Sequence, residues 1–262
     1  MTVAKSKKAL TANSHRIQIP RVQHIRDRTS PENVTGLPDY IQYMDAVLCV
    51  LHFTSGCVIV SETGKYSRDI RVNVHSSMEH HSIVVSSFDI MLSISIYFWI
   101  TAVFHLIYAC KFENRWIFNK WVEYGITAGI MIDILGVITG TVYLTNLIML
   151  WALIDTTMIF GYLYEKYNTK CFVYWGCLPF VFAWITLFIQ FSFTISKITL
   201  PTYGIAMLFI QFVLFSNFAL IPLCKTTDVC YILSFKLLSL MSKLLEGWVI
   251  FVGVKINFEN LD

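Results

Sequence analysis

The sequence predicts an all-α membrane protein, a bundle of seven transmembrane helices. Of its 262 residues, 56% are hydrophobic and 14% are charged, whereas a soluble domain carries about 25% charged residues. The alternating segments of about ten residues that build a transmembrane β-barrel do not occur. Apolar stretches long enough to cross a membrane as helices follow one another near residues 41–61, 88–110, 121–143, 145–164, 172–195, 202–223 and 229–254. The later connections are short, so neighbouring helices should pack antiparallel.

The polar, basic start of the chain predicts its orientation. Residues 1–38 are expected to form a flexible cytoplasmic tail ahead of one domain, residues 39–262. Cytoplasmic segments collect Lys and Arg. With the N-terminus inside, thirteen of these residues fall on the cytoplasmic side and five on the outer side. The sequence therefore predicts a multi-pass membrane protein with its N-terminus cytoplasmic and its C-terminus extracellular.

The first outer loop, residues 62–87, predicts a β-hairpin. Ile70, Val72 and Val74 alternate with polar residues, and a second β-branched run follows at residues 83–85. A two-stranded hairpin alone is only marginally stable. We therefore expect it to lie on the helix bundle or to pair with a partner subunit.

No metal site is predicted. The seven cysteines lie in or beside apolar spans and predict neither a disulfide framework nor a thiol metal site. A solvated turn explains the polar cluster of the hairpin as well as a metal site does; the cluster comprises His75, Glu79, His80 and His81.

The last span, which contains "SLMSKLLEGWVIF", includes Lys243, a charged residue whose position in an apolar helix must be explained. If Lys236 marks the inner boundary and Lys255 the outer one, they lie about 28 Å apart along a helix, and both can reach water. Lys243 then lies about 10 Å deep, where a charge costs about 2.5 to 3.5 kcal/mol. It either forms a structural ion pair or supplies the desolvated amine that forms a Schiff base with a carbonyl compound.

A protonated Schiff base needs an anion, and the third span offers one. If Lys120 marks the inner boundary of that span, Glu123 lies about 4.5 Å deeper and Asp133 about 20 Å deeper. Helical side chains lean toward the N-terminus of their helix, so the side chain of Lys243 points toward the level of Glu123. The two groups can meet if spans three and seven are neighbours, which the sequence does not show.

Five segments in order give the chain a resemblance to the heliorhodopsin family: "VLHFTSG", "TAVFHLIYA", "RWIFNKWVEYGITAGIM", "LFSNFAL" and "SLMSKLLEGW". The resemblance implies a rhodopsin-like bundle with all-trans retinal on Lys243, Glu123 as the Schiff-base counterion, and Ser239 hydrogen-bonding near that pair. It also implies a homodimer and a polar cavity that contains His52 and His105. Glu246 stands where the family leads us to expect an apolar residue.

Further residues are candidates for the retinal pocket and for a proton path. Thr127 and Met131 follow Glu123 on one helix face, and Tyr124 is adjacent to it. Aromatic residues of spans five and six are candidate pocket walls: Trp184, Phe188, Phe212 and Phe215. Each remaining polar group has two readings, a proton relay or a neutral group satisfied by a neighbouring helix; the groups are His52, His105, Asp133 and Glu246.

The resemblance predicts a photoreceptor that is not an enzyme. Its partners would be retinal, the lipid membrane, a second copy of the chain and an unknown signalling partner, with no nucleic acid. The alternative is light-triggered proton transport or conduction, which Asp133 and Glu246 suggest. A zinc hydrolase of the adiponectin-receptor type is disfavoured because the last span has no histidine.

Overall fold

Seven long helices and one β-hairpin make up the described part of the chain, residues 39–75, 80–110, 116–197, 202–224 and 227–259 of a computed structural model. The predicted tail, residues 1–38, lies outside these residues. In chain order the elements are α1 (Asp39–Val60), β1 (Ser67–His75), β2 (His80–Asp89), α2 (Ile90–Ala109), α3 (Trp116–Ile138), α4 (Leu144–Tyr167), α5 (Cys171–Ile195), α6 (Thr202–Leu220), the short 3₁₀ helix η3 (Ile221–Leu223) and α7 (Asp228–Glu259).

All seven predicted spans are confirmed as helices long and apolar enough to cross a membrane. The predicted bounds of the third span were wrong by about one turn, because α3 runs from Trp116 to Ile138 and not from 121 to 143. Gly140, two residues after the helix ends, has a φ of 105° that suits glycine. There the Thr141 amide donates to the Gly136 carbonyl at 2.7 Å, and the chain turns into α4.

Helices that follow one another in the chain pack side by side: α1 on α2, α2 on α3, α3 on α4, α4 on α5, and α6 on α7. Helix α3 is the central one, since 78% of its span is buried against 22% of the spans of α4 and α5. Small residues allow close approach of helices in membranes. Gly129 of α3, for example, lies directly against the indole ring of Trp151 on α4.

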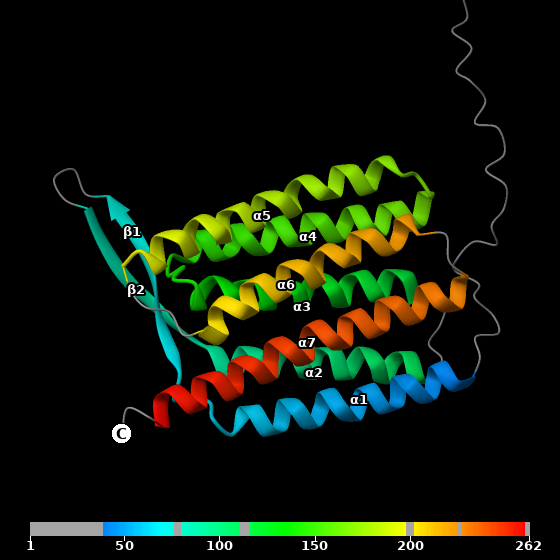
Figure 1. Ribbon diagram of the computed structural model, residues 1–262, viewed down its shortest axis with the longest axis horizontal. Helices are drawn as coiled ribbons and strands as arrows, with labels where there is room; N and C mark the ends of the chain where they lie inside the picture. The colour runs from blue at the N-terminus through cyan, green and yellow to red at the C-terminus, as the bar shows by residue number, and fades with distance from the viewer. Residues whose placement is uncertain (1–38, 76–79, 111–115, 198–201, 225–226, 260–262) are drawn as a thin grey trace, which may run out of the picture.

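The bundle has two ends, the tail end and the hairpin end (Figure 1). At the tail end α1 and α7 begin and α2 ends; at the hairpin end α1 and α7 end and the two strands lie across the bundle. Residues that follow one another along α3 or α7 therefore pass from the tail end to the hairpin end.

The predicted hairpin is confirmed, and it lies on the bundle. Strands β1 and β2 pair antiparallel, with a bulge between Ile70 and Arg71. The Ile70 side chain is buried, and the Arg71 amide donates to the Val142 carbonyl of the α3–α4 connection at 2.8 Å. Asp89 at the end of β2 caps α2 by accepting from the Leu92 amide at 2.9 Å.

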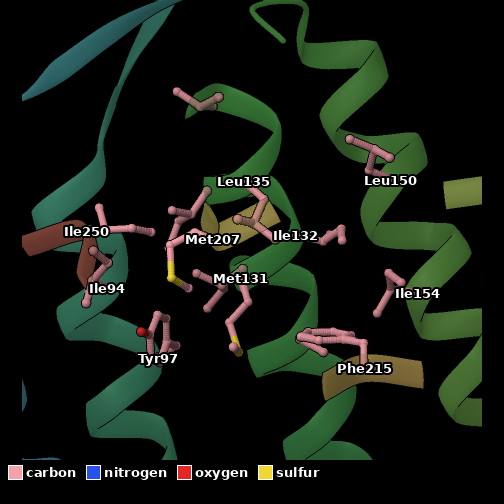
Figure 2. Packing of buried hydrophobic residues seen from close by; sticks show 14 of the residues in the cluster. Ile94, Tyr97, Met131, Ile132, Leu135, Leu150, Ile154, Met207, Phe215 and Ile250 are labelled. Atoms are coloured by element: carbon pink, nitrogen blue, oxygen red, sulfur yellow. The ribbon is translucent and has the colours of Figure 1, made fainter. Parts of the chain in front are cut away.

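The apolar core at the middle of the bundle comes from several helices (Figure 2). Met131 of α3 lies near Met207 of α6, and Ile250 of α7 lies near Ile94 of α2. These side chains are buried. They pack α3 against α6 and α7 against α2, and α3 and α7 are the two helices that carry the candidate site.

Candidate functional site

Lys243 of α7 and Glu123 of α3 form a buried pair. The Nζ atom of Lys243 donates to Oε1 of Glu123 at 2.7 Å, and both side chains are at most 3% exposed. The Tyr124 ring adds a cation–π contact, with its centroid 5.6 Å from Nζ. Spans three and seven are therefore neighbours at this level, which the sequence did not show.

Both members of the pair are held by hydrogen bonds. The Tyr108 hydroxyl of α2 donates to Oε2 of Glu123 at 3.1 Å, so each carboxylate oxygen has a donor. The Tyr97 hydroxyl, also on α2, donates to the backbone carbonyl of Lys243 at 3.0 Å. Charge-assisted hydrogen bonds in a low-dielectric interior are strong and directional. The site is therefore built on helices that fix its geometry.

A small apolar pocket, with a cavity volume of about 20 Å³, lies beside the Lys243 amine. Four helices contribute to it: α3, α4, α6 and α7. Its lining combines apolar and aromatic side chains with a few hydroxyls and comprises Tyr124, Thr127, Ala128, Met131, Met158, Phe215, Phe218, Ser239, Ser242 and Lys243. Of the residues singled out in the sequence, Tyr124, Thr127, Met131, Phe215 and Ser239 line this pocket.

The other predicted aromatic residues lie behind the pocket wall. Trp184 of α5 contacts Phe215 edge to face at a centroid distance of 5.9 Å, and it contacts Phe212 at 5.2 Å. Phe188 packs on Phe212 at 5.5 Å. Trp184 and Phe212 are thus absent from the lining of the pocket and buttress its wall through Phe215.

A second small cavity, the polar cavity, has a volume of about 10 Å³ and also borders Glu123. Helices α2, α3 and α7 enclose it. Its lining is rich in charged and hydroxyl groups and comprises His105, Tyr108, Lys120, Glu123, Tyr124, Lys236 and Ser239. Glu123, Tyr124 and Ser239 are close to both spaces, because Tyr124 and Ser239 line both and Glu123 contacts Lys243.

Asp45 of α1 is contacted by two side chains that line the polar cavity. Lys236 of α7 donates to Oδ1 of Asp45, and Nδ1 of His105 lies 2.8 Å from the same oxygen. All three side chains are at most 5% exposed. His52 stacks on His105 at a centroid distance of 5.6 Å. Within the described residues, the ring nitrogens of His52 have no hydrogen-bond partner.

The interpretation of Lys236 as a residue at the membrane boundary that reaches water was therefore wrong. Its partner lies 191 residues earlier in the chain, and only the fold brings the two together. Lys255, in contrast, is exposed as expected.

Lys120 is likewise buried. It pairs with Glu165 of α4, which also accepts from the Trp121 indole at 2.8 Å and from the Tyr231 hydroxyl at 2.5 Å. The Phe235 ring centroid lies 4.2 Å from the Lys120 ammonium. This cluster joins α3, α4 and α7 near the tail end.

Two predicted carboxylates lie apart from these networks, toward the hairpin end. Glu246 lies one turn beyond Lys243 and is fully buried, and neither of its oxygens has a hydrogen-bond partner among the described residues. Asp133 is buried on α3 with one oxygen unpartnered. Among the described residues no hydrogen bond joins Glu123, Asp133 and Glu246 directly, and the proton path stays a prediction.

Sequence reasoning missed Asp45, Tyr108 and Glu165. A signal existed for Asp45, which precedes His52 by two helical turns and so lies on the same face of α1. Tyr108 lies one turn after His105 for the same reason. Glu165 was assigned to a loop because the fourth span was ended at 164, whereas α4 continues to Tyr167.

Comparison with solved structures assigns the class of protein. The chain is similar in fold to a light-driven proton pump, LR (Mac), from Leptosphaeria maculans, with a TM-score of 0.62 over 86% of this chain and 96% of that one. The sequence identity is 10%, so this likeness concerns the fold alone. The protein is thus a multi-pass membrane protein with a rhodopsin-like fold.

The family follows from the sequence. A model of the heliorhodopsin family matches residues 41–255, and the chain belongs to that family. A search of curated proteins found no relative. Membership implies a retinal chromophore and a light-sensing membrane protein. The residues present fit that group, because a buried lysine amine lies beside an apolar and aromatic pocket with a carboxylate within hydrogen-bonding distance.

Proposed function

We propose that this heliorhodopsin senses light through retinal held by Lys243, with Glu123 as the counterion. The observation that carries the proposal is the 2.7 Å contact between Nζ of Lys243 and Oε1 of Glu123, buried beside the apolar pocket. An unpaired charge at this depth would be costly. A structural ion pair alone would not require an apolar space next to the amine, whereas a bound polyene does.

When bound, retinal supplies an aldehyde that condenses with the Lys243 amine, with loss of water, and a polyene that isomerises on absorbing light. Glu123 stabilises the proton on Nζ of Lys243 through its Oε1 atom. Tyr108 keeps the carboxylate oriented by donating to Oε2, and Tyr97 holds the Lys243 backbone. The apolar lining excludes water from the nitrogen, so the proton stays under the control of Glu123.

The surrounding side chains would shape the pocket. Tyr124, Thr127, Met131 and Ser239 lie on the two helices that carry the pair, and we assign them to contact with retinal near Lys243. Phe215 would form part of the wall. Trp184 and Phe212 would limit its movement from behind. His52 and His105 belong to the polar cavity and would take part in internal proton exchange.

The test is an absorption spectrum of the purified protein with all-trans retinal. The wild-type protein should absorb visible light, and Lys243→Ala should abolish the band completely. Lys255→Ala is the matched control, because Lys255 lies on the same helix and is exposed. A visible band that survives in Lys243→Ala would overturn the assignment.

Light-triggered proton transport is the second candidate function. Buried, unpartnered carboxyl oxygens at Glu246 and Asp133 favour it, since intramembrane carboxylates often mark proton paths. Illuminated cells under voltage clamp discriminate between the two functions. A photocurrent that depends on pH and is lost in Glu246→Gln would establish transport, whereas no photocurrent over a range of pH would exclude it.

The orientation and the assembly are also part of the proposal. The excess of Lys and Arg on the tail side supports a cytoplasmic N-terminus. The exposed side chains of Ile83, Val84 and Val85 on β2 offer an apolar surface for a homodimer. Protease protection of an N-terminal tag in sealed vesicles tests the first point, and light scattering of the detergent-solubilised protein tests the second. A signalling partner would read the light-induced change of the bundle.

A further inference from the structure

Three buried lysines among the described residues each have a carboxylate partner: Lys120 with Glu165, Lys236 with Asp45, and Lys243 with Glu123. The second pair is the unusual one, because it lies at the polar cavity beside the third. Lys236 and Glu123 line the same cavity. The charge of Lys236 therefore bears on the carboxylate that the proposed function assigns to Lys243.

Lys236 has access to both carboxylates. Its Nζ atom donates directly to Oδ1 of Asp45. The same atom lies 5.2 Å from the centroid of the Tyr108 ring, and the hydroxyl of that ring bonds Oε2 of Glu123 at 3.1 Å. Lys236 and Glu123 also interact electrostatically across the cavity. A lysine side chain is long and flexible, so a modest rotation would carry the ammonium from Asp45 toward Glu123.

We propose that Asp45 is a positioning residue that holds Lys236 away from Glu123 and thereby reserves the charge of Glu123 for the nitrogen of Lys243. In this arrangement α1 controls the counterion without touching it. His105 contributes by placing Nδ1 against the same Asp45 oxygen, which fixes the carboxylate between α1, α2 and α7. This inference rests on the proposed function for its optical consequence, although the lysine position itself does not depend on retinal.

The groups that face the Lys236 ammonium favour this account. On α1 there is Asp45, and α7 contributes Ser239. The remaining elements supply one cation, one anion, one imidazole and two phenol hydroxyls: His105 and Tyr108 from α2, and Lys120, Glu123 and Tyr124 from α3. Lys120 is already engaged by Glu165. Without Asp45, the anion open to Lys236 within the cavity lining is Glu123.

The optical test compares Asp45→Asn with the double variant Asp45→Asn/Lys236→Met. In Asp45→Asn, Lys236 should turn to Glu123 and weaken the interaction of Glu123 with the retinal-bound nitrogen. The visible band should then shift to longer wavelength, and the pH midpoint at which that band is lost should fall. We expect about a tenfold change in proton affinity, or about one pH unit. The double variant removes the competing cation and should return both values to near those of the wild type.

The outcomes separate the claims. Equal shifts in the single and double variants, or no shift in either, would overturn the inference. If Asp45→Asn does not fold, Lys236→Met alone tests the inference. This variant leaves the Asp45 carboxylate as a second anion beside Glu123, so the pH midpoint at which the visible band is lost should rise. An unchanged midpoint would overturn the inference. The double variant should fold, because replacing both members of a buried pair is tolerated better than removing one.

A second readout needs no retinal. In retinal-free membranes with ¹⁵N-labelled lysine side chains and ¹³C-labelled glutamate carboxyls, solid-state NMR distance measurements should find one more lysine nitrogen near a glutamate carboxyl in Asp45→Asn than in the wild type. The double variant should lose that signal, and its absence from Asp45→Asn would contradict the inference. A wild-type protein without a visible band would instead refute the proposed function, while this measurement would still decide the position of Lys236.

Discussion

The two halves of the bundle differ in whether their buried ionisable groups have partners of opposite charge. From Lys243 toward the tail end, each buried lysine of the described chain has a carboxylate, and Tyr108, Trp121 and Tyr231 donate further hydrogen bonds. From Glu246 toward the hairpin end, the described residues hold buried carboxyl groups and no buried cation. Charge balance thus changes within one turn of α7.

This difference explains how one helix, α7, can carry both the reactive amine of Lys243 and a neutral carboxylic acid, Glu246. An ionised group buried without a partner is very costly, so the groups at the tail end are stable as charged pairs. Glu246 has no such partner and is expected to be neutral. The boundary between the two halves places the Lys243 nitrogen where a paired, polar network meets an apolar core.

The largest effect should follow from breaking the Lys120–Glu165 pair, which joins α3 to α4 near the tail end. Lys120→Met leaves Glu165 buried with only the Trp121 and Tyr231 donors. Removing one member of a buried ion pair costs about 3 to 5 kcal/mol. We expect a clear fall in the melting temperature of the purified protein. Lys65→Met is the control, because Lys65 is exposed and pairs with Glu62 at the surface, and equal melting temperatures for the two variants would contradict the comparison.

Glu123→Gln should give the next largest effect, on the optical properties. It removes the anion that faces the retinal-bound nitrogen, so the band should move to longer wavelength and the pH midpoint of its loss should fall by about 1 to 3 pH units. Absorbance titration measures both.

Asp133→Asn is the matched control for Glu123→Gln, since Asp133 lies on the same helix toward the hairpin end and contacts no cation among the described residues. It should leave the band in place. A spectrum unchanged in Glu123→Gln would transfer the counterion role to Glu246.

Much of the fold was predictable from the sequence because the membrane imposes it. Apolar runs of sufficient length must satisfy their backbone groups internally and so become helices. Alternation of β-branched and polar residues predicted the hairpin, although not its docking on the α3–α4 connection. Lys243 and Glu123 stood out for the same reason, as charges inside apolar spans.

The partners of those charges were not predictable, because they depend on which helices meet. Asp45 and Lys236 are 191 residues apart, and each lies close enough to the end of its span to be taken for an interfacial residue. A sequence shows that a residue lies within an apolar span, but it does not show the angle at which its helix faces a neighbour. Only the structure therefore revealed the polar cavity, whereas Lys243 was found from hydropathy alone.

The smallest effect is expected at Glu246. If this acid is neutral, Glu246→Gln replaces one neutral side chain by another of similar shape, and both the visible band and the melting temperature should stay within error of the wild type. Infrared spectroscopy supplies a positive signal, because the variant should lose the carbonyl stretch of a protonated carboxylic acid. A wavelength shift as large as that of Glu123→Gln would mean that Glu246 is ionised and shares the positive charge of the nitrogen. The division between the two halves would then fall beyond Glu246, and the counterion would be a pair of carboxylates on opposite sides of Lys243.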